Sequence, residues 1–390
     1  MRTLPRTVWA LGATSLFMDF SSELVHGLLP VFMTVVLGAS MVAVGVVEGI
    51  AEATASIIKL FSGVVSDRLG RRKPLVVLGY GLAALSKPLF PLACTVGLVL
   101  GARFIDRVGK GIRGAPRDAL IVDVTAQGQR GAAYGLRQAL DTVGAVLGPL
   151  AAIGLMVLMA SDIRAVLWLA VIPAAISVLI LAAFVRESSA VAPSANPISF
   201  QSIGSLDTHY WAIVALGAVF TLARFSEAFL IIRAQDAGLA LAFVPVTLVV
   251  MNLVYAAIAY PAGVAADRGR RRALLVWGLS ALIAADLLLA SSAHLLLFLA
   301  GVVLWGVHLG LTQGLLSTLV ADAAPERLRG TAFGMFHLVS GVALLGASVL
   351  AGWLWARFGA AATFYVGAAF TAIALAGLLA TTRGRSPGTR

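Results

Sequence analysis

The feature that most constrains this chain is a series of long apolar stretches, most of them at or above the roughly 20 residues that a helix needs to cross a bilayer. Short apolar strands of the barrel type are absent from the pattern, and backbone groups in hydrocarbon must all be hydrogen-bonded. We therefore predict twelve transmembrane helices. They cover residues 8–36, 42–66, 74–95, 97–120, 130–160, 163–185, 209–235, 241–266, 273–292, 294–321, 330–356 and 361–382.

The composition agrees with a membrane protein. Hydrophobic residues make up 60% of the chain and charged residues only 12%, whereas an average soluble domain is about 25% charged. This is too little charge to coat a water-facing surface, so a soluble multidomain enzyme and a disordered or fibrous chain are excluded. The single cysteine, Cys94, rules out an internal disulfide and a cysteine-based metal motif.

The basic residues predict the orientation of the helices. Most of the 29 Lys and Arg residues lie at one set of segment ends, and only Arg164, Arg233 and Arg357 lie at the other set. By the positive-inside rule, both termini are expected in the cytoplasm, in a multi-pass protein of a bacterial-type cytoplasmic (inner) membrane. The net charge of +11 is then a consequence of topology, and we expect no nucleic-acid partner.

The chain divides into two halves that repeat. The longest polar interruption, residues 186–208, is rich in Ser, Pro and Ala and is expected to be a cytoplasmic linker between residues 1–185 and 209–390. The residues 63–72 recur as 263–272, and a second set of matches is offset by 199 residues. Internal repeats of this kind are typical of transporters whose site lies at the interface of the repeats.

Three groups of residues carry a family resemblance. The run Gly-Val-Val-Ser-Asp-Arg-Leu-Gly-Arg-Arg at 63–72 resembles the signature of the major facilitator superfamily between spans two and three. Arg103 resembles that family's buried arginine of span four. Gly144, Gly148 and Pro149 resemble part of the antiporter motif of its drug-efflux members. The resemblance implies an all-α fold of twelve transmembrane helices in two six-helix bundles, which rock to give alternating access.

The resemblance also implies that the signature acts as a latch that closes the cytoplasmic side. A carboxylate at position 67 can face a helix N-terminus, which carries about half a positive charge, and the neighbouring Arg residues can pair with acids. The alternative is that these Arg residues only anchor the topology. The expected latch comprises Gly63, Asp67, Arg68, Gly70, Arg71, Arg72, Asp123, Arg130, Asp267, Arg268, Asp322 and Arg329.

Carboxylates inside the predicted spans indicate proton coupling. A charge at the bilayer centre is costly, so such residues mark pathways by default. Spacing places Asp19 and Glu23 on one helix face, and carboxylates gathered in a dry site cannot all ionise, so one can bind a proton and release it later. The alternative is a static salt-bridge network. The expected proton-coupling residues are Asp19, Glu23, Asp141, Glu52 and Asp106.

Other polar residues in the spans are expected to line a substrate cavity. They must turn away from lipid, and in the second half they are fewer than in the first. A lone histidine such as His308 is more often structural, and this alternative stays open. The expected cavity residues are His26, Arg103, Arg107, Arg137, Gln138, Arg224, Glu227, Asn252, Tyr255 and His308.

The sequence thus predicts a proton-coupled secondary transporter of a small molecule that works as a monomer in the bilayer, with efflux by antiport as the favoured mode. A proton symporter that takes up an organic anion or a metal chelate is the first alternative, and a non-coupled lipid translocase of the same fold is the second. The chain has no Gly-rich nucleotide loop, and its five His residues lack metal-ligand spacing. We therefore expect no enzyme activity, no cofactor and no metal site.

Overall fold

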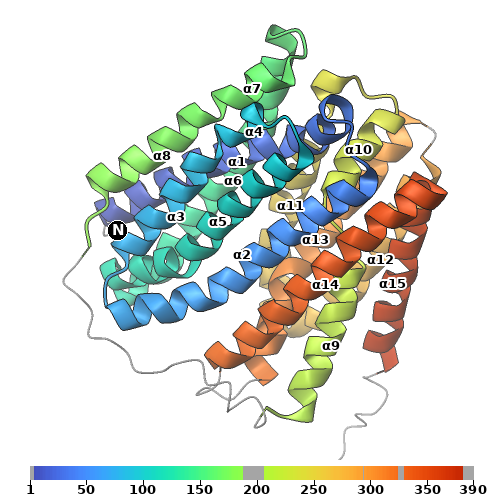
Figure 1. Cartoon of the computed structure of the whole chain (residues 1–390). Helices are drawn as coiled ribbons and strands as arrows, with labels where there is room; N and C mark the ends of the chain where they lie inside the picture. The colour runs from blue at the N-terminus through green and yellow to red at the C-terminus, as the bar shows by residue number, and fades with distance from the viewer. Residues whose placement is uncertain (1–3, 188–205, 293, 324–328, 381–390) are drawn as a thin grey trace, which may run out of the picture.

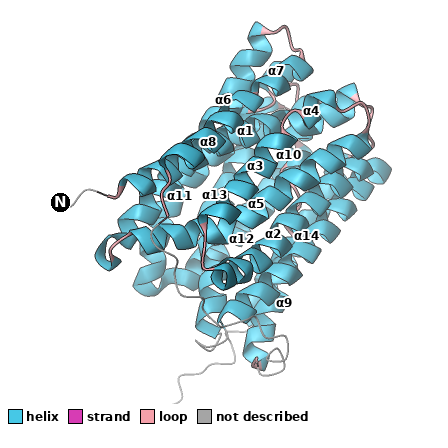
Figure 2. Ribbon diagram, turned by 60° about the vertical axis from the view of Figure 1, so that its left-hand side comes forward, coloured by secondary structure: helices cyan, strands magenta, loops and turns pink. Residues whose placement is uncertain are grey.

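The computed structural model describes residues 4–187, 206–292, 294–323 and 329–380, and every regular element in these ranges is helical (Figure 2). We call residues 4–187 the first half and residues 206–380 the second half. The α-helices of the first half are α1 (Arg6–Val31), α2 (Met41–Leu69), α3 (Lys73–Ser86), α4 (Leu89–Leu92), α5 (Val96–Val124), α6 (Arg130–Leu158), α7 (Ile163–Leu169) and α8 (Val171–Phe184). Those of the second half are α9 (Thr208–Leu222), α10 (Ala228–Asp236), α11 (Val246–Ala265), α12 (Arg271–Ser291), α13 (Leu295–Ala323), α14 (Arg329–Phe358) and α15 (Ala360–Ala380).

Caps and glycines account for several helix ends. Ser40, Thr95 and Asp162 accept hydrogen bonds from backbone N–H groups at the starts of α2, α5 and α7. Gly70 ends α2 with a left-handed φ of +60°, and Gly269 between α11 and α12 has a φ of +81°. These two glycines lie 199 positions apart, whereas residues 63–72 and 263–272 match at an offset of 200. The two repeated loops therefore share a left-handed turn, which comes one residue earlier in the second loop than the sequence match would place it.

Ten helical stretches of the described residues are long and apolar enough to cross a membrane. Two of the twelve expected segments do not qualify in the same way. The segment 97–120 forms the continuous helix α5, which is long enough to cross a membrane but carries too many charged side chains to count among the apolar stretches. The segment 209–235 is interrupted at residues 223–227, which separate α9 from α10. The expected linker 186–208 lies mostly outside the described residues.

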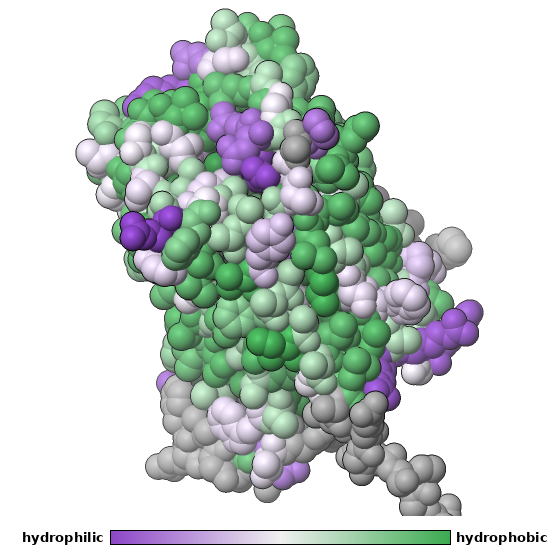
Figure 3. All heavy atoms as spheres, turned by 90° about the vertical axis from the view of Figure 1, so that its right-hand side faces the viewer, coloured by the Kyte–Doolittle hydropathy of each residue, from purple (hydrophilic) through white to green (hydrophobic). Residues whose placement is uncertain are grey.

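The outer surface is largely apolar. Figure 3 shows hydrophobic side chains over most of one face of the molecule. Large apolar side chains such as Leu158, Leu296 and Trp277 are more than two-thirds exposed. A soluble protein rarely exposes apolar patches of this extent, so this surface is suited to contact with lipid.

The helices run between two ends of the molecule (Figure 1). We call the end that carries residues 4, 187 and 206 the terminal end, and the opposite end the far end. Within each half, neighbouring helices pack along their length, as α1 does with α6 and α12 with α13. The halves meet where α2 packs on α14, α6 on α11 and α1 on α10.

Within the described ranges, the buried apolar cluster that contains residues of both halves lies toward the far end. This cluster contains Leu28 of α1 and Phe32 just after it, together with Phe229 and Leu248 from the second half. At the terminal end, the buried clusters of the described residues belong to one half or the other. The halves are therefore sealed together at the far end and less closely joined at the terminal end.

Candidate functional site

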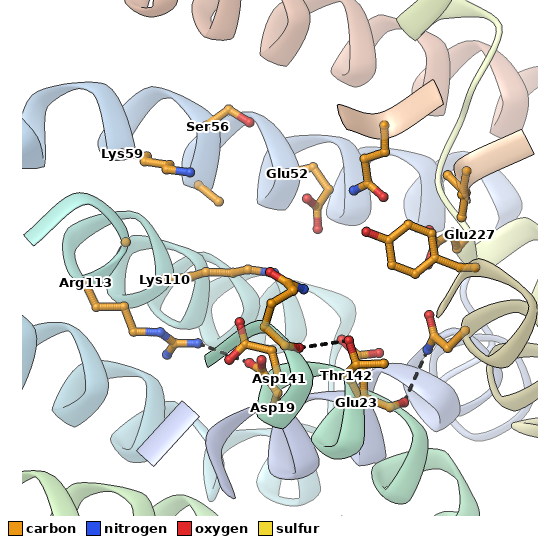
Figure 4. A pocket seen from close by; sticks show the side chains of 18 of the residues that line it. Asp19, Glu23, Glu52, Ser56, Lys59, Lys110, Arg113, Asp141, Thr142 and Glu227 are labelled. Carbon is orange, nitrogen blue, oxygen red and sulfur yellow. Dashed lines mark hydrogen bonds and ion pairs between the residues drawn. The ribbon is translucent and has the colours of Figure 1, made fainter. Parts of the chain in front are cut away.

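A cavity of about 560 Å³ lies between the two halves, is lined by side chains of both (Figure 4) and is partly open to the outside of the molecule. Its wall comes from α1, α2, α5 and α6 in the first half, and from α11, α13, α14 and the 223–227 interruption in the second. Most lining side chains are polar or charged. They are Asp19, Glu23, Glu52, Ser56, Lys59, Lys110, Arg113, Arg117, Arg137, Gln138, Asp141, Thr142, Arg224, Glu227, Asn252, Tyr255, Gln313 and His337, with Ala55, Gly114, Ala145 and Leu309.

Two carboxylates, Asp19 on α1 and Asp141 on α6, lie at the centre of this wall (Figure 4). An oxygen of Asp141 is 2.8 Å from a guanidinium nitrogen of Arg137, one helical turn away. An oxygen of Asp19 is 3.8 Å from a nitrogen of Arg113, whose guanidinium also stacks 4.4 Å from the ring centre of Tyr80. Each carboxylate thus has a cationic neighbour but remains in contact with the cavity.

Close packing of α6 on α1 brings these carboxylates together. A Cβ atom at Gly144 would lie 2.5 Å from the carbonyl oxygen of Leu16, and one at Gly148 would lie 2.6 Å from that of Phe20. Both distances are shorter than any ordinary contact, so only glycine permits this approach. The residues that resemble an antiporter motif therefore set the spacing of the two helices that carry Asp19 and Asp141.

The charges deeper in the cavity are less evenly paired. An oxygen of Glu52 is 3.1 Å from a nitrogen of Arg107. Within the described part of the chain, Glu23 makes no hydrogen bond or ion pair, and its side chain lines the cavity together with Glu52 and Lys110 (Figure 4). The same holds for the cations of Lys59, Lys110 and Arg224, which lack an ion-pair partner in the ranges described.

The second half supplies part of the wall, as the sequence predicted for Arg224, Glu227, Asn252 and Tyr255. Arg224 and Glu227 come from the interruption between α9 and α10. The side-chain amide of Asn252 donates a 3.2 Å hydrogen bond to the backbone oxygen of Ala145, which links α11 to α6 across the two halves. Gln138 also lines the cavity, beside Arg137.

Asp106, Arg107 and Arg103 do not lie in the cavity wall, in contrast to their expected roles there. Asp106 is buried and 2.8 Å from the ammonium group of Lys87, and an oxygen of the same carboxylate is 3.7 Å from Arg107. Arg103 is buried and donates a 2.7 Å hydrogen bond to Glu48. Helical spacing placed these residues on an inward stripe of α5, but this part of the stripe faces α2 and α3.

Both histidines of the expected cavity set are buried beside the cavity instead of lining it. The Nδ1 atom of His308 is 2.9 Å from the backbone oxygen of Gly278, and its ring stacks on Phe220. This agrees with the structural alternative for a lone histidine. His26 contacts Arg103 through Nδ1 at 3.0 Å, and its Nε2 atom is 3.9 Å from Glu227.

The expected latch residues form a compact cluster in the first half. Arg72 lies 2.7 Å from Asp67 and 2.8 Å from Asp123, and also donates to the hydroxyl of Ser66. Its backbone N–H donates to the carboxylate of Glu187. Burial alone would lower the pKa of Arg72, but the hydrogen bonds and charges of Asp67 and Asp123 outweigh it and raise the pKa. The guanidinium therefore stays charged at every physiological pH.

The other expected latch residues take no part in this cluster as described. Arg68, Arg71 and Arg130 are exposed. Arg268 lies in the repeated loop of the second half. A Cβ atom added at Gly63 would lie 3.4 Å from that of Ala115, so this position does not require glycine for space. The side chains of Asp267, Asp322 and Arg329 lie outside those that the structure describes.

The structure adds functional candidates that the sequence interpretation did not select. Lys110, Arg113 and Arg117 line the cavity, and Asp118 bridges Arg117 and Arg137 at 3.3 Å and 2.9 Å. The spacing of the three cations along α5, at i, i+3 and i+7, was a usable signal. Asp118 had none, because it lies near the end of a predicted span.

Comparison with known proteins agrees with this architecture. The family model of the Major Facilitator Superfamily matches residues 11–251 and 212–390. An uncharacterised MFS-type transporter of Methanocaldococcus jannaschii is 33% identical over 368 residues, which are 91% of this chain and 89% of that protein. Multidrug resistance protein MdtH of Proteus mirabilis is 32% identical over 114 residues, 29% of this chain and 28% of that protein.

Solved structures show the same fold at low sequence identity. A bacterial homologue of the human lysosomal transporter Spinster, in an inward-facing and unoccupied conformation, superposes with a TM-score of 0.75 at 16% identity, over 99% of this chain and 100% of that one. The family model covers nearly the whole chain. The chain therefore belongs to the Major Facilitator Superfamily and is a multi-pass membrane transporter.

Proposed function

We propose that this protein is a proton-coupled secondary transporter that exports a small molecule across the inner membrane by antiport. In this proposal, residues 1–185 and 209–390 form two six-helix bundles joined by a cytoplasmic linker at 186–208, and both termini are cytoplasmic. The single observation that carries the proposal is the mixed-charge cavity between the halves, with Asp19, Glu23 and Asp141 in its wall.

The cavity has the position that alternating access requires. The apolar contacts that join the halves gather toward the far end, and the clusters at the terminal end belong to one half each. With cytoplasmic termini, the cavity opens inward. The bundles would rock about their contacts, so that the terminal end closes and the far end opens. The inward-facing conformation of the Spinster homologue supports this interpretation.

The carboxylates of the wall are the proposed proton carriers. Asp19 and Asp141 lie on tightly packed helices among Arg113, Arg117 and Arg137. Each change in the spacing of the bundles changes the distance between these charges, and with it the tendency of a carboxylate to hold a proton. A proton that binds from the outside and is released to the inside would drive the conformational change that turns the cavity from one side of the membrane to the other.

Antiport is favoured by competition between substrate and proton for the same carboxylates. Glu23 has no ion-pair partner in the described part of the chain and is accessible from the cavity. A cationic group of a substrate could pair with Glu23, next to the carboxylates that are proposed to bind the proton. The glycines of α6 and the similarity to MdtH over 114 residues also point toward efflux.

The test begins with a ligand screen, since a compound that binds the folded state raises its melting temperature. Transport of the best compound is then followed in liposomes under an imposed pH gradient. We expect D19N, E23Q and D141N each to reduce the gradient-driven flux at least about tenfold, as typical for removal of a proton-transfer group. The matched control is D236N, which removes an exposed far-end carboxylate. Full gradient-driven transport in all three variants would overturn the coupling assignment.

Proton symport of an organic anion is a second candidate, and one observation favours it. The ammonium groups of Lys59 and Lys110 and the guanidinium of Arg224 face the cavity without an ion-pair partner among the described residues. An anionic substrate would compensate these charges, and protonated wall carboxylates would assist its binding. In symport, the flux follows the proton gradient instead of opposing it. If the substrate is an anion, K59Q, K110Q and R224Q should weaken its binding. If the substrate is a cation that is exchanged for protons, the same variants should leave its binding unchanged or strengthen it.

A further inference from the structure

His26 occupies a singular position between the two halves. Its side chain is buried in α1, and its Nε2 atom lies 3.9 Å from an oxygen of Glu227, at the start of α10. The other ion pairs in which both side chains are described each stay within one half. A change in the charge of His26 is therefore a change in the contact between the halves.

The hydrogen bond from Arg103 fixes the state of the ring. The guanidinium group has only N–H donors and no acceptor. Its Nη2 atom lies 3.0 Å from Nδ1 of His26, so Nδ1 must accept with its lone pair. The proton of the neutral ring is then on Nε2, which points toward Glu227. A doubly protonated ring would place an N–H of its own against that of Arg103, so protonation of His26 and this hydrogen bond exclude each other.

Arg103 can form a second hydrogen bond to Glu48. It already donates from Nη2 to one oxygen of Glu48 at 2.7 Å. The other oxygen of Glu48 and the Nε atom of Arg103 are buried and lack a hydrogen-bond partner. A small rotation would turn the single bond into a paired, side-on contact that uses both free atoms. This rotation would release Nδ1 of His26 for a proton.

Charged groups of both signs face His26. Arg103 and Arg107 from α5 lie opposite the carboxylates of Glu48 and Glu52 from α2, of Glu23 from α1 itself and of Glu227 just before α10. Movement of Arg103 away from the ring would remove the positive charge that contacts it, and the carboxylates would then favour protonation of the imidazole. A protonated imidazole would also replace the 3.9 Å contact to Glu227 with a full ion pair across the halves.

We propose that His26 is a proton-binding site that joins the two halves: proton uptake moves Arg103 onto Glu48 and strengthens the His26–Glu227 contact. Binding then stabilises the form that is closed at the far end, and proton release loosens it. By thermodynamic linkage, the conformation in which His26 contacts Glu227 binds the proton more tightly than the conformation in which this contact is lost. The inference rests on the alternating access proposed above, but not on the identity of the substrate or on the coupling carboxylates.

The conformational test uses distances between spin labels at the far end. Leu158 and Leu296 are exposed there, one in each half, and are replaced by cysteine in a C94S background. In the otherwise wild-type protein, we expect the far-end-closed population to rise as pH falls, by up to about tenfold in population ratio per pH unit for one linked proton. H26Q and E227Q should each lower this dependence by the share of one linked proton, and the double variant should lower it no further. D236N, which removes an exposed carboxylate at the far end, is the control that keeps the full dependence.

The protonation test uses nitrogen-15 NMR of labelled histidine in lipid. The His26 signals are assigned by elimination among the five His residues, from single Gln variants of His209, His294, His308 and His337. At high pH we expect the His26 signals of an Nε2–H tautomer, and at low pH those of an imidazolium. This measurement on wild-type protein keeps the proposal testable if H26Q fails to fold. A proton on Nδ1 at high pH, or an unchanged label distance with pH in the wild type, would overturn it.

The outcomes separate this inference from the proposed function. If D19N and D141N lose gradient-driven transport while the pH response of the labels is undiminished in H26Q, the role of His26 is refuted and proton coupling stands. If the labels respond to pH through His26 while no proton gradient drives transport, the role of His26 stands and proton-coupled transport is refuted.

Discussion

On α5, one run of charged residues faces two different surroundings. Asp106 pairs with the buried Lys87, just after α3, and Arg107 pairs with Glu52 of α2, whereas Lys110 and Arg113 face the cavity. Spacing alone predicts a common inward face, because residues three and four apart lie on one side of a helix. It cannot tell which inward positions meet a helix and which meet water. Partner identity, such as Lys87 for Asp106, is therefore known only from the packed structure.

The buried pair of Asp106 and Lys87 gives a prediction at this scale. Lys87 is 1% exposed, so D106N leaves an unpaired ammonium group in the interior. We expect this to cost about 3–5 kcal/mol and to lower the melting temperature strongly. The double variant K87M/D106L removes both charges and should recover most of the loss.

Transport by the folded fraction of D106N separates structure from coupling. We expect the gradient-driven flux per folded molecule to stay near the wild-type value, because Asp106 does not line the cavity. A variant that melts like the wild type but loses proton-driven transport would instead place Asp106 among the proton carriers, as its position in the sequence first suggested.

Other residue positions were predictable from spacing. Asp19 and Glu23 share a helix face in the sequence, and both line the cavity. The pairing of Arg137 with Asp141 at i and i+4 is present at 2.8 Å. Glu23 and Arg103 lie on predicted inward faces of two different helices, but Arg103 forms its ion pair with Glu48. Local pairs follow from helix geometry, but pairs between helices do not.

At the scale of elements, the packing of α6 on α1 is governed by glycine. The carbonyl oxygens of Leu16 and Phe20 lie only 2.5 Å and 2.6 Å from the positions that a Cβ of Gly144 or of Gly148 would occupy. Close approach of helices through small residues is common in membranes, where packing replaces the hydrophobic effect between helices. The position of the carboxylates on these two helices depends on this approach.

Alanine substitutions on α6 test this dependence. We expect G144A and G148A to push α6 from α1, to lower the melting temperature and to reduce transport together. G154A is the matched control on the same helix, because no atom lies within 4 Å of its added Cβ. It should keep full activity, with stability unchanged or slightly raised by better helix propensity. Equal behaviour of G144A and G154A would refute the spacing role.

The cluster around Arg72 gives a second prediction for an element, the α2–α3 loop. Arg72 joins Asp67 to Asp123 at the end of α5. We expect R72Q to speed amide hydrogen exchange in residues 64–76 and 119–125, since the two carboxylates lose their shared cation. R71Q, which removes an exposed neighbour, is the control. Unchanged exchange in R72Q would favour the simple anchoring role for these arginines.

Helix bounds were largely predictable, and interruptions were not. The apolar pattern predicted a segment at 42–66, and α2 spans Met41–Leu69. The stop between α9 and α10 was missed because long apolar stretches flank it on both sides. Arg224, Ser226 and Glu227 lie in that stop, and these polar side chains were its signal. Such a break is tolerated where it lines a cavity, and this could not be known before the cavity was seen.

At the scale of the whole molecule, the halves differ in what they contribute. The first half carries four of the five cavity carboxylates, and the second half carries Glu227 and most of the uncharged polar wall. Their repeat was readable from the sequence. Their mutual arrangement was not, because it depends on contacts such as α2 with α14 that no sequence pattern records.

One cavity that opens to the two sides in turn underlies every function proposed for this protein. Labelling of a cavity cysteine tests it most directly. Ser56 lines the cavity, and Cys94 is free and exposed, so the variant is S56C in a C94S background, in vesicles of known orientation. In the resting protein we expect a membrane-impermeant thiol reagent to reach Cys at position 56 from the terminal end only. Substrate with a pH gradient should open access from the far end and reduce it from the terminal end. Equal labelling from both ends at once, or from neither end, would contradict alternating access.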